Sequence, residues 1–240
     1  MNRLISALVA TASIAGPLFG QDSAQYIAPD SVAMRELADV RAEDSTIVVE
    51  ARYFTPNNFT GAVLPGYEAN KAYLRREAAE ALHRVQQRLL SGGMGLKIFD
   101  GYRPVRATQA MVDWARRTRQ MHLIEDGYIA SRSRHNLGLA VDLTLVDFSV
   151  GGREVDMGTP FDTFSEEAHW ANASGRTMRY RQLLRQVMEA EGFKQYDQEW
   201  WHYSFEVHHD EHFKARSRAR FEHGSARGSL RFKDASAHSA

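Results

Sequence analysis

Helical and strand-like hydrophobic patterns follow each other in irregular order along the middle of this chain. Apolar residues at three- and four-residue steps predict a helix over 69–90 that ends at Ser91-Gly92-Gly93. Similar patterns predict two further helices, over 105–117 and 180–191. Apolar or alternating runs predict strands over 48–54, 96–99, 139–146 and 201–207. Because the order has no regular strand–helix–strand rhythm, we expect an α+β fold rather than a doubly wound sheet.

Charge and cysteine content exclude several classes of function. The chain has 240 residues, with 30 basic and 30 acidic side chains, so no global field attracts nucleic acid or an anionic membrane. It contains no cysteine, which excludes disulfides, thiolate zinc sites, iron–sulfur clusters and a cysteine nucleophile. Any metal must therefore bind to His, Asp or Glu. The sequence gives no indication of the oligomeric state.

The two ends of the chain differ from the middle. Residues 1–20 combine a basic start at Arg3, an almost entirely apolar or small segment over 4–19, and a small residue at Gly20. This pattern predicts a secretory signal peptide, a secreted or periplasmic protein, and no stable membrane insertion after cleavage. An uncleaved anchor and a buried first helix are the alternatives. Export of this kind would leave a mature chain that begins near Gln21.

Residues 214–240 contain seven basic and two acidic side chains among Gly, Ser and Ala. Such a composition buries little apolar surface and predicts a flexible basic tail. An arm that binds nucleic acid is the alternative. We therefore expect the globular domain to occupy residues 21–213.

Four polar side chains stand out in the predicted strands and the loops before them. Asp142 lies inside an apolar strand, where a lone buried carboxylate would be costly. His135 precedes it by seven residues, and Glu199 and His202 stand where the last strand begins. A turn or bulge before Trp201 would be needed to aim Glu199 and His202 at the same point, because residues three apart face opposite ways in a plain strand.

Two His and one Asp form a suitable zinc site when no sulfur is present, and they leave a fourth position for water. Glu199 could then move the proton of that water, and Arg103 could stabilise a developing oxyanion. Each residue also has an ordinary structural explanation. His202 could be a hydrogen-bonded core residue, and Asp142 could pair with Arg103. The spacing alone leaves metal binding and a polar core both open.

The order of these residues resembles a known family. Ser133-x-His135-x-x-Gly138-x-Ala140-x-Asp142, followed by Glu199-x-x-His202, is similar to the zinc D-alanyl-D-alanine dipeptidases of the VanX type. These enzymes belong to a wider group with the zinc D,D-carboxypeptidases and the Hedgehog signalling domain. The resemblance extends from about residue 47 to 205 and includes three more blocks, at 51–61, 96–104 and 156–162.

The resemblance implies a single domain with a central antiparallel sheet flanked by helices, one Zn²⁺ per chain, and hydrolysis of the D-Ala-D-Ala dipeptide in cell-wall peptide turnover. By the same resemblance, His135, Asp142 and His202 are the zinc ligands, Glu199 is the general base and Arg103 steadies the oxyanion. The residues expected to hold the amino end of the substrate are Ser133, Tyr53 and Asp162.

Three alternatives remain at this point. A D,D-carboxypeptidase would use the same mechanism on longer peptidoglycan stem peptides, although the 156–162 block favours the dipeptidase. A zinc-containing binding module without turnover would need neither Glu199 nor Arg103. A protein that tethers to the cell wall would depend on the basic tail.

Overall fold

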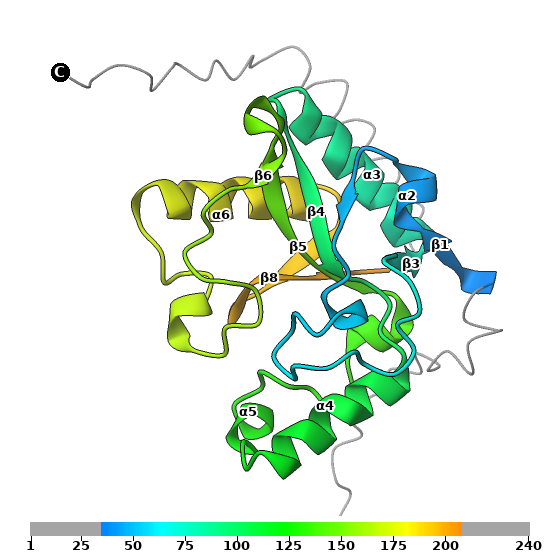
Figure 1. The fold of residues 1–240 in the computed structure, drawn as a ribbon. Helices are drawn as coiled ribbons and strands as arrows, with labels where there is room; N and C mark the ends of the chain where they lie inside the picture. The colour runs from blue at the N-terminus through cyan, green and yellow to red at the C-terminus, as the bar shows by residue number, and fades with distance from the viewer. Residues whose placement is uncertain (1–34, 208–240) are drawn as a thin grey trace, which may run out of the picture.

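A six-stranded sheet forms the centre of the molecule in the computed structural model, which describes residues 35–207 (Figure 1). The strands run in the order β2-β4-β5-β8-β7, and β6 pairs with β5. The β4–β5, β5–β8, β5–β6 and β7–β8 pairs are antiparallel, and the β2–β4 pair is parallel. Their bounds are β2 Val48–Val49, β4 Met94–Asp100, β5 Ala140–Asp147, β6 Arg153–Glu154, β7 Phe193–Tyr196 and β8 Glu199–Phe205. A separate two-stranded sheet pairs β1 (Leu37–Asp39) with β3 (Tyr73–Arg75).

Helices cover this sheet and close one end of it (Figure 1). Helix α3 (Arg76–Leu90) packs on β4, and α6 (Gly175–Glu189) packs on β7 and on α3. The short α2 (Val40–Glu43) contacts α3, while α4 (Val105–Arg117) and α5 (His122–Glu125) lie together at the lower end of the view. Among residues 35–207, none of these helices combines the length and the apolar composition needed to cross a bilayer.

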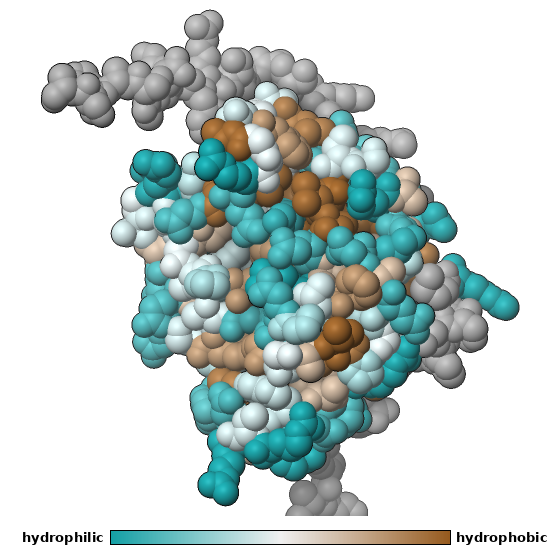
Figure 2. Space-filling view, viewed as in Figure 1, coloured by the Kyte–Doolittle hydropathy of each residue, from teal (hydrophilic) through white to brown (hydrophobic). Residues whose placement is uncertain are grey.

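Strand β5 is the central element because nearly all of it is buried. Leu143 and Leu145 are fully buried, as are the neighbouring Trp201 and Tyr203 of β8. Burying one such side chain contributes about 1.5–3 kcal/mol, so these residues contribute substantially to the stability of the sheet. On the face shown in Figure 2 the surface is mostly hydrophilic, with apolar patches in the upper part of the view and a smaller one lower down. The buried centre therefore provides a rigid support for the few polar groups of β5.

The predicted α+β class and the central, largely antiparallel sheet are confirmed. The helix predicted over 105–117 is confirmed with the same bounds. Strands β4 and β5 lie where strands were predicted, and β8 covers 199–205 instead of 201–207. Helix α6 begins five residues before the predicted Tyr180, in a polar segment that carries no apolar stripe, and ends at Glu189.

Two predictions are wrong in part. The helix predicted over 69–90 begins only at Arg76, because residues 73–75 form β3 and pair with β1. The strand predicted over 48–54 ends at Val49, and a 3₁₀ helix follows over Arg52–Phe54. The Asn70 side chain accepts a hydrogen bond from the Ala51 backbone N–H at 2.8 Å, so the chain leaves the sheet there. Local periodicity carries no information about such long-range partners.

The strands β1, β6 and β7 and the helices α2 and α5 were not predicted. The predicted signal peptide over 1–20 and the predicted tail over 214–240 lie outside the described residues, and so do both limits of the predicted 21–213 domain.

Candidate functional site

Sheet register brings Asp142 and His202 together. Asp142 of β5 lies directly opposite His202 of β8, and His202 Nδ1 lies 2.9 Å from Asp142 Oδ1. On its other side Asp142 lies opposite Asp100, at the end of β4. Directly opposed residues of an antiparallel pair have Cβ atoms only about 4.5–5.5 Å apart, so this contact follows from the backbone itself.

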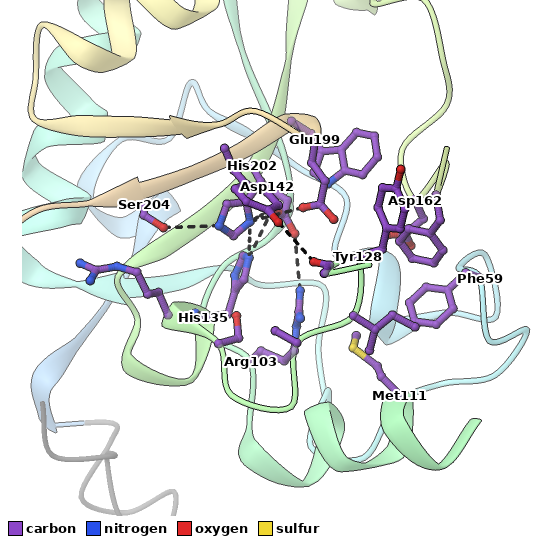
Figure 3. A pocket seen from close by; sticks show the side chains of 18 of the residues that line it. Phe59, Arg103, Met111, Tyr128, His135, Asp142, Asp162, Glu199, His202 and Ser204 are labelled. Atoms are coloured by element: carbon purple, nitrogen blue, oxygen red, sulfur yellow. Dashed lines mark hydrogen bonds and ion pairs between the residues drawn. The ribbon is translucent and has the colours of Figure 1, made fainter. Parts of the chain in front are cut away.

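A bulge in β8 adds Glu199 to this group. Gln195 of β7 lies opposite Tyr203, but the next residue, Tyr196, lies opposite Glu199, so the register shifts within β8. Glu199 Oε2 consequently lies 3.8 Å from His202 Nδ1 (Figure 3). An irregularity was predicted before Trp201; the observed one spans residues 200–202, between these two pairs, and it allows two residues three apart to face the same point.

His135 comes from a short 3₁₀ helix, Arg134–Leu137, that precedes β5. The Ser133 hydroxyl accepts a hydrogen bond from the His135 backbone N–H at 3.2 Å, and the Asn136 side chain accepts one from Ser133. This capping box fixes the start of the turn, and Gly138, at φ 66°, ends it in the left-handed region that favours glycine. His135 is buried.

The tautomer of His135 follows from its hydrogen bond to a backbone carbonyl. His135 Nδ1 lies 2.7 Å from the Gly101 oxygen, which can only accept, so Nδ1 carries the hydrogen and Nε2 carries a lone pair. Nε2 lies 3.2 Å from His202 Nδ1 and 3.3 Å from Asp142 Oδ1 (Figure 3). A partner of this kind on the second ring nitrogen is usual for histidines that bind metals.

These three atoms fit a metal ion. One ligand atom from each of His135, Asp142 and His202 lies within 4.8 Å of the other two. In a tetrahedral zinc site with bonds of about 2.0–2.1 Å, ligand atoms lie roughly 3.3 Å apart. The separations of 2.9, 3.2 and 3.3 Å are close to this value.

The ionisation of the same groups also suits a cation. Burial lowers the pKa of His202, which favours the neutral imidazole that a metal requires. Burial alone would raise the pKa of Asp142, but His135 and His202 beside it outweigh that effect, so the net pKa is low and the carboxylate is ionised. Arg103 also lies near Asp142, and a divalent cation would add further positive charge beside this buried carboxylate.

Arg103 faces the same group from the loop that follows β4. Its Nε and Nη2 lie 2.9 and 2.8 Å from Asp100 Oδ2, and Nη2 lies 3.5 Å from Asp142 Oδ2. Tyr67 donates a hydrogen bond to the other Asp100 oxygen at 2.6 Å. Arg103 therefore does pair with Asp142, as the structural explanation of these residues predicted. Its contact with Asp100 is shorter. Asp100 was not singled out from the sequence, although it stands three residues before Arg103.

Glu199 is nearly buried and carries an unusual carboxyl group. Burial and the nearby charges of Asp142 and Asp162 raise the pKa of Glu199 well above its ordinary value, and Arg103 only partly opposes them. A carboxylate in such surroundings accepts a proton readily. Chemically, Glu199 is therefore suited to take a proton from a molecule in the pocket and to return it.

Tyr53 and Asp162 meet on the opposite side of the pocket. The Tyr53 hydroxyl donates a hydrogen bond to Asp162 Oδ1 at 3.0 Å, while Asp162 Oδ2 is buried without a hydrogen-bond partner. Burial raises the pKa of Asp162 to about 7. Asp162 also has a φ of 62°, in the left-handed region that residues other than glycine seldom adopt, although aspartate does so more often than most.

The predicted site residues all line one pocket of about 210 Å³, which includes Ser133 at its edge. The hydroxyl oxygen of Ser133 caps the turn that carries His135, so the structure gives it a structural role as well. Sequence reasoning missed the apolar wall of the pocket and a serine beside His202. These residues are Phe59, Met111, Tyr128 and Ser204, which Figure 3 labels, and Phe164.

Some of the missed residues carried a signal in the sequence. Phe59 lies in the 51–61 block that supports the resemblance, and Ser204 stands two residues after His202 on the same face of β8. The Ser204 oxygen lies 3.4 Å from His202 Nε2. Tyr128 and Phe164 carried no such signal, because they come from loops that only the folded chain brings together.

Comparisons with known proteins identify the family of this chain. The family model described as D-ala-D-ala dipeptidase matches residues 33–218 of this chain. The D-alanyl-D-alanine dipeptidase of Enterococcus faecium is 38% identical over 169 residues, which cover 64% of this chain and 83% of that protein. The enzyme of the same name from Streptomyces coelicolor is 35% identical over 181 residues, which cover 68% of this chain and 89% of that protein.

A solved structure described as vancomycin resistance D,D-dipeptidase VanXYg, in complex with a D-Ala-D-Ala phosphinate analog, is 18% identical. The matched region covers 78% of this chain and 71% of the chain in that structure, with a TM-score of 0.38. The assignment rests on the sequence matches, since the family model spans more than half of the chain. The chain therefore belongs to the D-ala-D-ala dipeptidase family.

Proposed function

We propose that this protein is a zinc-dependent hydrolase of the D-Ala-D-Ala dipeptide that acts in cell-wall peptide turnover. One observation carries the proposal. The ligand atoms of His135, Asp142 and His202 converge at one side of a small pocket, and an acid with an unsatisfied oxygen lies at the other side. Family membership supports the choice of dipeptide, because the relatives bear the name of that activity.

In this proposal His135, Asp142 and His202 would hold one zinc ion, and His135 Nε2, Asp142 Oδ1 and His202 Nδ1 are the atoms that face one another there. Zinc in such a site acts as a Lewis acid and lowers the pKa of a bound water towards about 7. The second nitrogen of His135 is fixed by the Gly101 carbonyl, which keeps the ligand lone pair aimed at the site.

Glu199 is the general base of the proposed reaction. Its carboxylate takes the proton of the attacking water and then gives it to the departing amine, so that two D-alanine molecules leave the pocket. Arg103, held by Asp100 at 2.8 Å, presents a fixed positive charge to the oxygen of the tetrahedral intermediate. Because Asp100 and Tyr67 orient Arg103 beforehand, little reorganisation is needed during the reaction.

Tyr53 and Asp162 form the proposed binding site for the free amino group of the substrate. The dipeptide carries an ammonium group close to its scissile bond, and Asp162 Oδ2 has no partner within the described protein. Asp162 lines the pocket, so an ammonium group bound there would supply a counter-charge to its carboxylate. Ser133, at the pocket edge, is proposed to contribute a further hydrogen bond to the substrate.

Three peptides test the proposed specificity. Zinc-loaded protein should hydrolyse D-Ala-D-Ala, and it should leave the L,L isomer intact and cleave a stem pentapeptide far more slowly. Faster release of D-alanine from the pentapeptide would replace the proposed dipeptidase with the D,D-carboxypeptidase.

Arg103→Ala is expected to lower the turnover of D-Ala-D-Ala by roughly 10²–10³-fold, the range for loss of one oxyanion donor. Zinc content should stay the same because Arg103 is not among the proposed ligands. Arg116→Ala, which removes an exposed arginine of α4, is the matched control and should keep the wild-type rate. Equal rates for the Arg103 and Arg116 variants would remove Arg103 from the mechanism. Steady-state kinetics with metal analysis of the same samples provides the comparison.

The pKa of Asp162 predicts a pH effect on substrate binding. Above pH about 7 the carboxylate is ionised and attracts the ammonium, and below this pH it is protonated and neutral. Asp162→Asn should therefore lower kcat/KM by about 10–100-fold at pH 8, because a charged hydrogen bond contributes about 1.5–3 kcal/mol. The ratio of wild-type to variant kcat/KM should fall as pH decreases through 7, and other titrating groups cancel in this ratio. A ratio that is independent of pH would exclude Asp162 as the ammonium site.

We also propose that the protein is exported, on the basis of residues 1–20, which lie outside the described residues. N-terminal sequencing of natively expressed protein should give a start near Gln21. An intact Met1 on soluble cytoplasmic protein would refute export and leave the proposed chemistry untouched.

A further inference from the structure

A buried arginine of α6 supports the segment that carries Asp162. Arg181 is fully buried on the inner face of the helix, on the same side as Leu184 and Met188. Burying a guanidinium costs several kcal/mol unless its N–H groups are hydrogen-bonded. A buried arginine is therefore expected to use its N–H groups in specific hydrogen bonds.

The hydrogen bonds of the Arg181 guanidinium go to backbone carbonyls of the loop between β6 and α6. Nε donates to Met157 O at 2.9 Å, and Nη2 donates to Glu167 O at 3.3 Å. Nη1 donates to His169 O at 2.6 Å and to Trp170 O at 3.3 Å. The Arg181 side chain thus joins Met157, near the start of the loop, to residues 167–170 further along it. Asp162 lies between these two points in the sequence.

The loop is shaped to receive this side chain. Gly158 has a φ of 96°, and a Cβ atom there would lie 3.1 Å from Arg181 Nη2 and 3.0 Å from Thr177 Cγ2. The absence of a side chain at Gly158 lets the backbone pass close over the guanidinium. Trp200 Nε1 donates to Thr159 Oγ1 at 2.9 Å and adds a second tie between the loop and the sheet.

Asp162 depends on this frame because its own conformation is unfavourable. Its φ of 62° is seldom adopted by residues other than glycine and its buried oxygen has no partner, and within residues 35–207 only the Tyr53 hydroxyl is hydrogen-bonded to its carboxylate. If the loop were free to relax, Asp162 could adopt a more common φ and its buried oxygen could reach a hydrogen-bond donor. The fork of an arginine, with five N–H donors in a plane, reaches carbonyls on both sides of the loop at once, which the single ammonium of lysine does not.

We propose that Arg181 is a positioning residue for substrate selection: by joining Met157 to residues 167–170, it holds the Asp162 carboxylate at the point where the ammonium group of the dipeptide binds. The inference rests on the proposed function. It adds that recognition of the free amino end depends on a side chain that does not line the pocket.

A double-mutant cycle with Arg181→Lys and Asp162→Asn tests this role. Arg181→Lys should raise the KM for D-Ala-D-Ala at least about tenfold, because the ammonium loses a charged hydrogen bond. It should leave kcat and zinc content within about twofold of wild type. In the Asp162→Asn background the same Lys substitution should change kcat/KM by less than about twofold, since the group it positions is already absent.

Two further variants complete the experiment. Arg179→Lys, at an exposed position of the same helix, is the matched control and should match wild type. Gly158→Ala should also raise the KM, because its Cβ would lie 3.1 Å from Arg181 Nη2 and a side chain at φ 96° strains the loop that carries Asp162, and it provides a second test of the loop should Arg181→Lys not fold. Zinc content and the thermal midpoint of each variant establish that the protein is folded at the assay temperature.

The outcomes separate this inference from the proposed function. An equal loss of kcat/KM on Arg181→Lys in both backgrounds, or a loss in kcat rather than a rise in KM, would overturn the positioning role while the wild-type enzyme remains active. A wild-type protein that hydrolyses no D-Ala-D-Ala would overturn the proposed function and this inference together.

Discussion

Glu199→Gln is expected to reduce the turnover of D-Ala-D-Ala by at least about a hundredfold, within the 10²–10⁴-fold that general acid–base groups contribute. The amide is nearly the same size as the carboxylate, so the fold and the bulge of β8 should persist. It cannot accept the proton of the attacking water, and it cannot deliver one to the leaving amine. Steady-state kinetics and metal analysis on the same preparation measure both properties.

The expected combination is normal zinc content with very low turnover. Glu199 is not among the three proposed ligands, and its Oε2 lies 3.8 Å from His202 Nδ1. Glu154→Gln, on the exposed edge strand β6, is the matched control and should retain full activity. A Glu199→Gln protein with a full complement of zinc and a rate near wild type would show that another group moves the proton.

Removal of the metal should abolish activity altogether. His202→Ala takes away one of the three proposed ligands and leaves Asp142, buried in β5, without its 2.9 Å contact. Zinc content should fall from one ion per chain to a small fraction, and turnover should fall with it. Treatment of the wild type with a chelator should give the same loss, and added zinc should restore it.

His83→Ala provides the control for the removal of a histidine. His83 lies on α3, pairs with Asp44 and is half-exposed, far along the chain from the proposed ligands. The zinc content of the His83→Ala protein should equal that of wild type. Stoichiometric zinc in His202→Ala would exclude His202 from the ligand set and would require a different metal site.

The proposed ligands could be identified from the sequence because each one lies in a contiguous block with fixed spacing. Asp142 stands out as an acid in an apolar strand, and the blocks around His135 and His202 follow a known order. Their convergence depends on sheet register, in particular the pairing of Asp142 with His202, which no local pattern contains. The resemblance supplied this information in advance, whereas spacing alone left a polar core equally open.

Residues that act across the fold could not be identified in this way. Asp100, Tyr128 and Arg181 reach the site or its frame from different elements, and each looks like an ordinary polar residue in the sequence. The same limit explains the error at the start of α3, since only pairing with β1 turns Tyr73–Arg75 into a strand. Local periodicity predicted the long buried elements well and failed where a distant partner decides the conformation.

The most direct test of the account is the release of D-alanine from D-Ala-D-Ala by purified wild-type protein that holds one zinc per chain. We expect two molecules of D-alanine for each dipeptide consumed, with no release after chelation and recovery on addition of zinc. A protein that binds one zinc ion through His135, Asp142 and His202 but releases no D-alanine would contradict the account and would indicate a binding module without turnover.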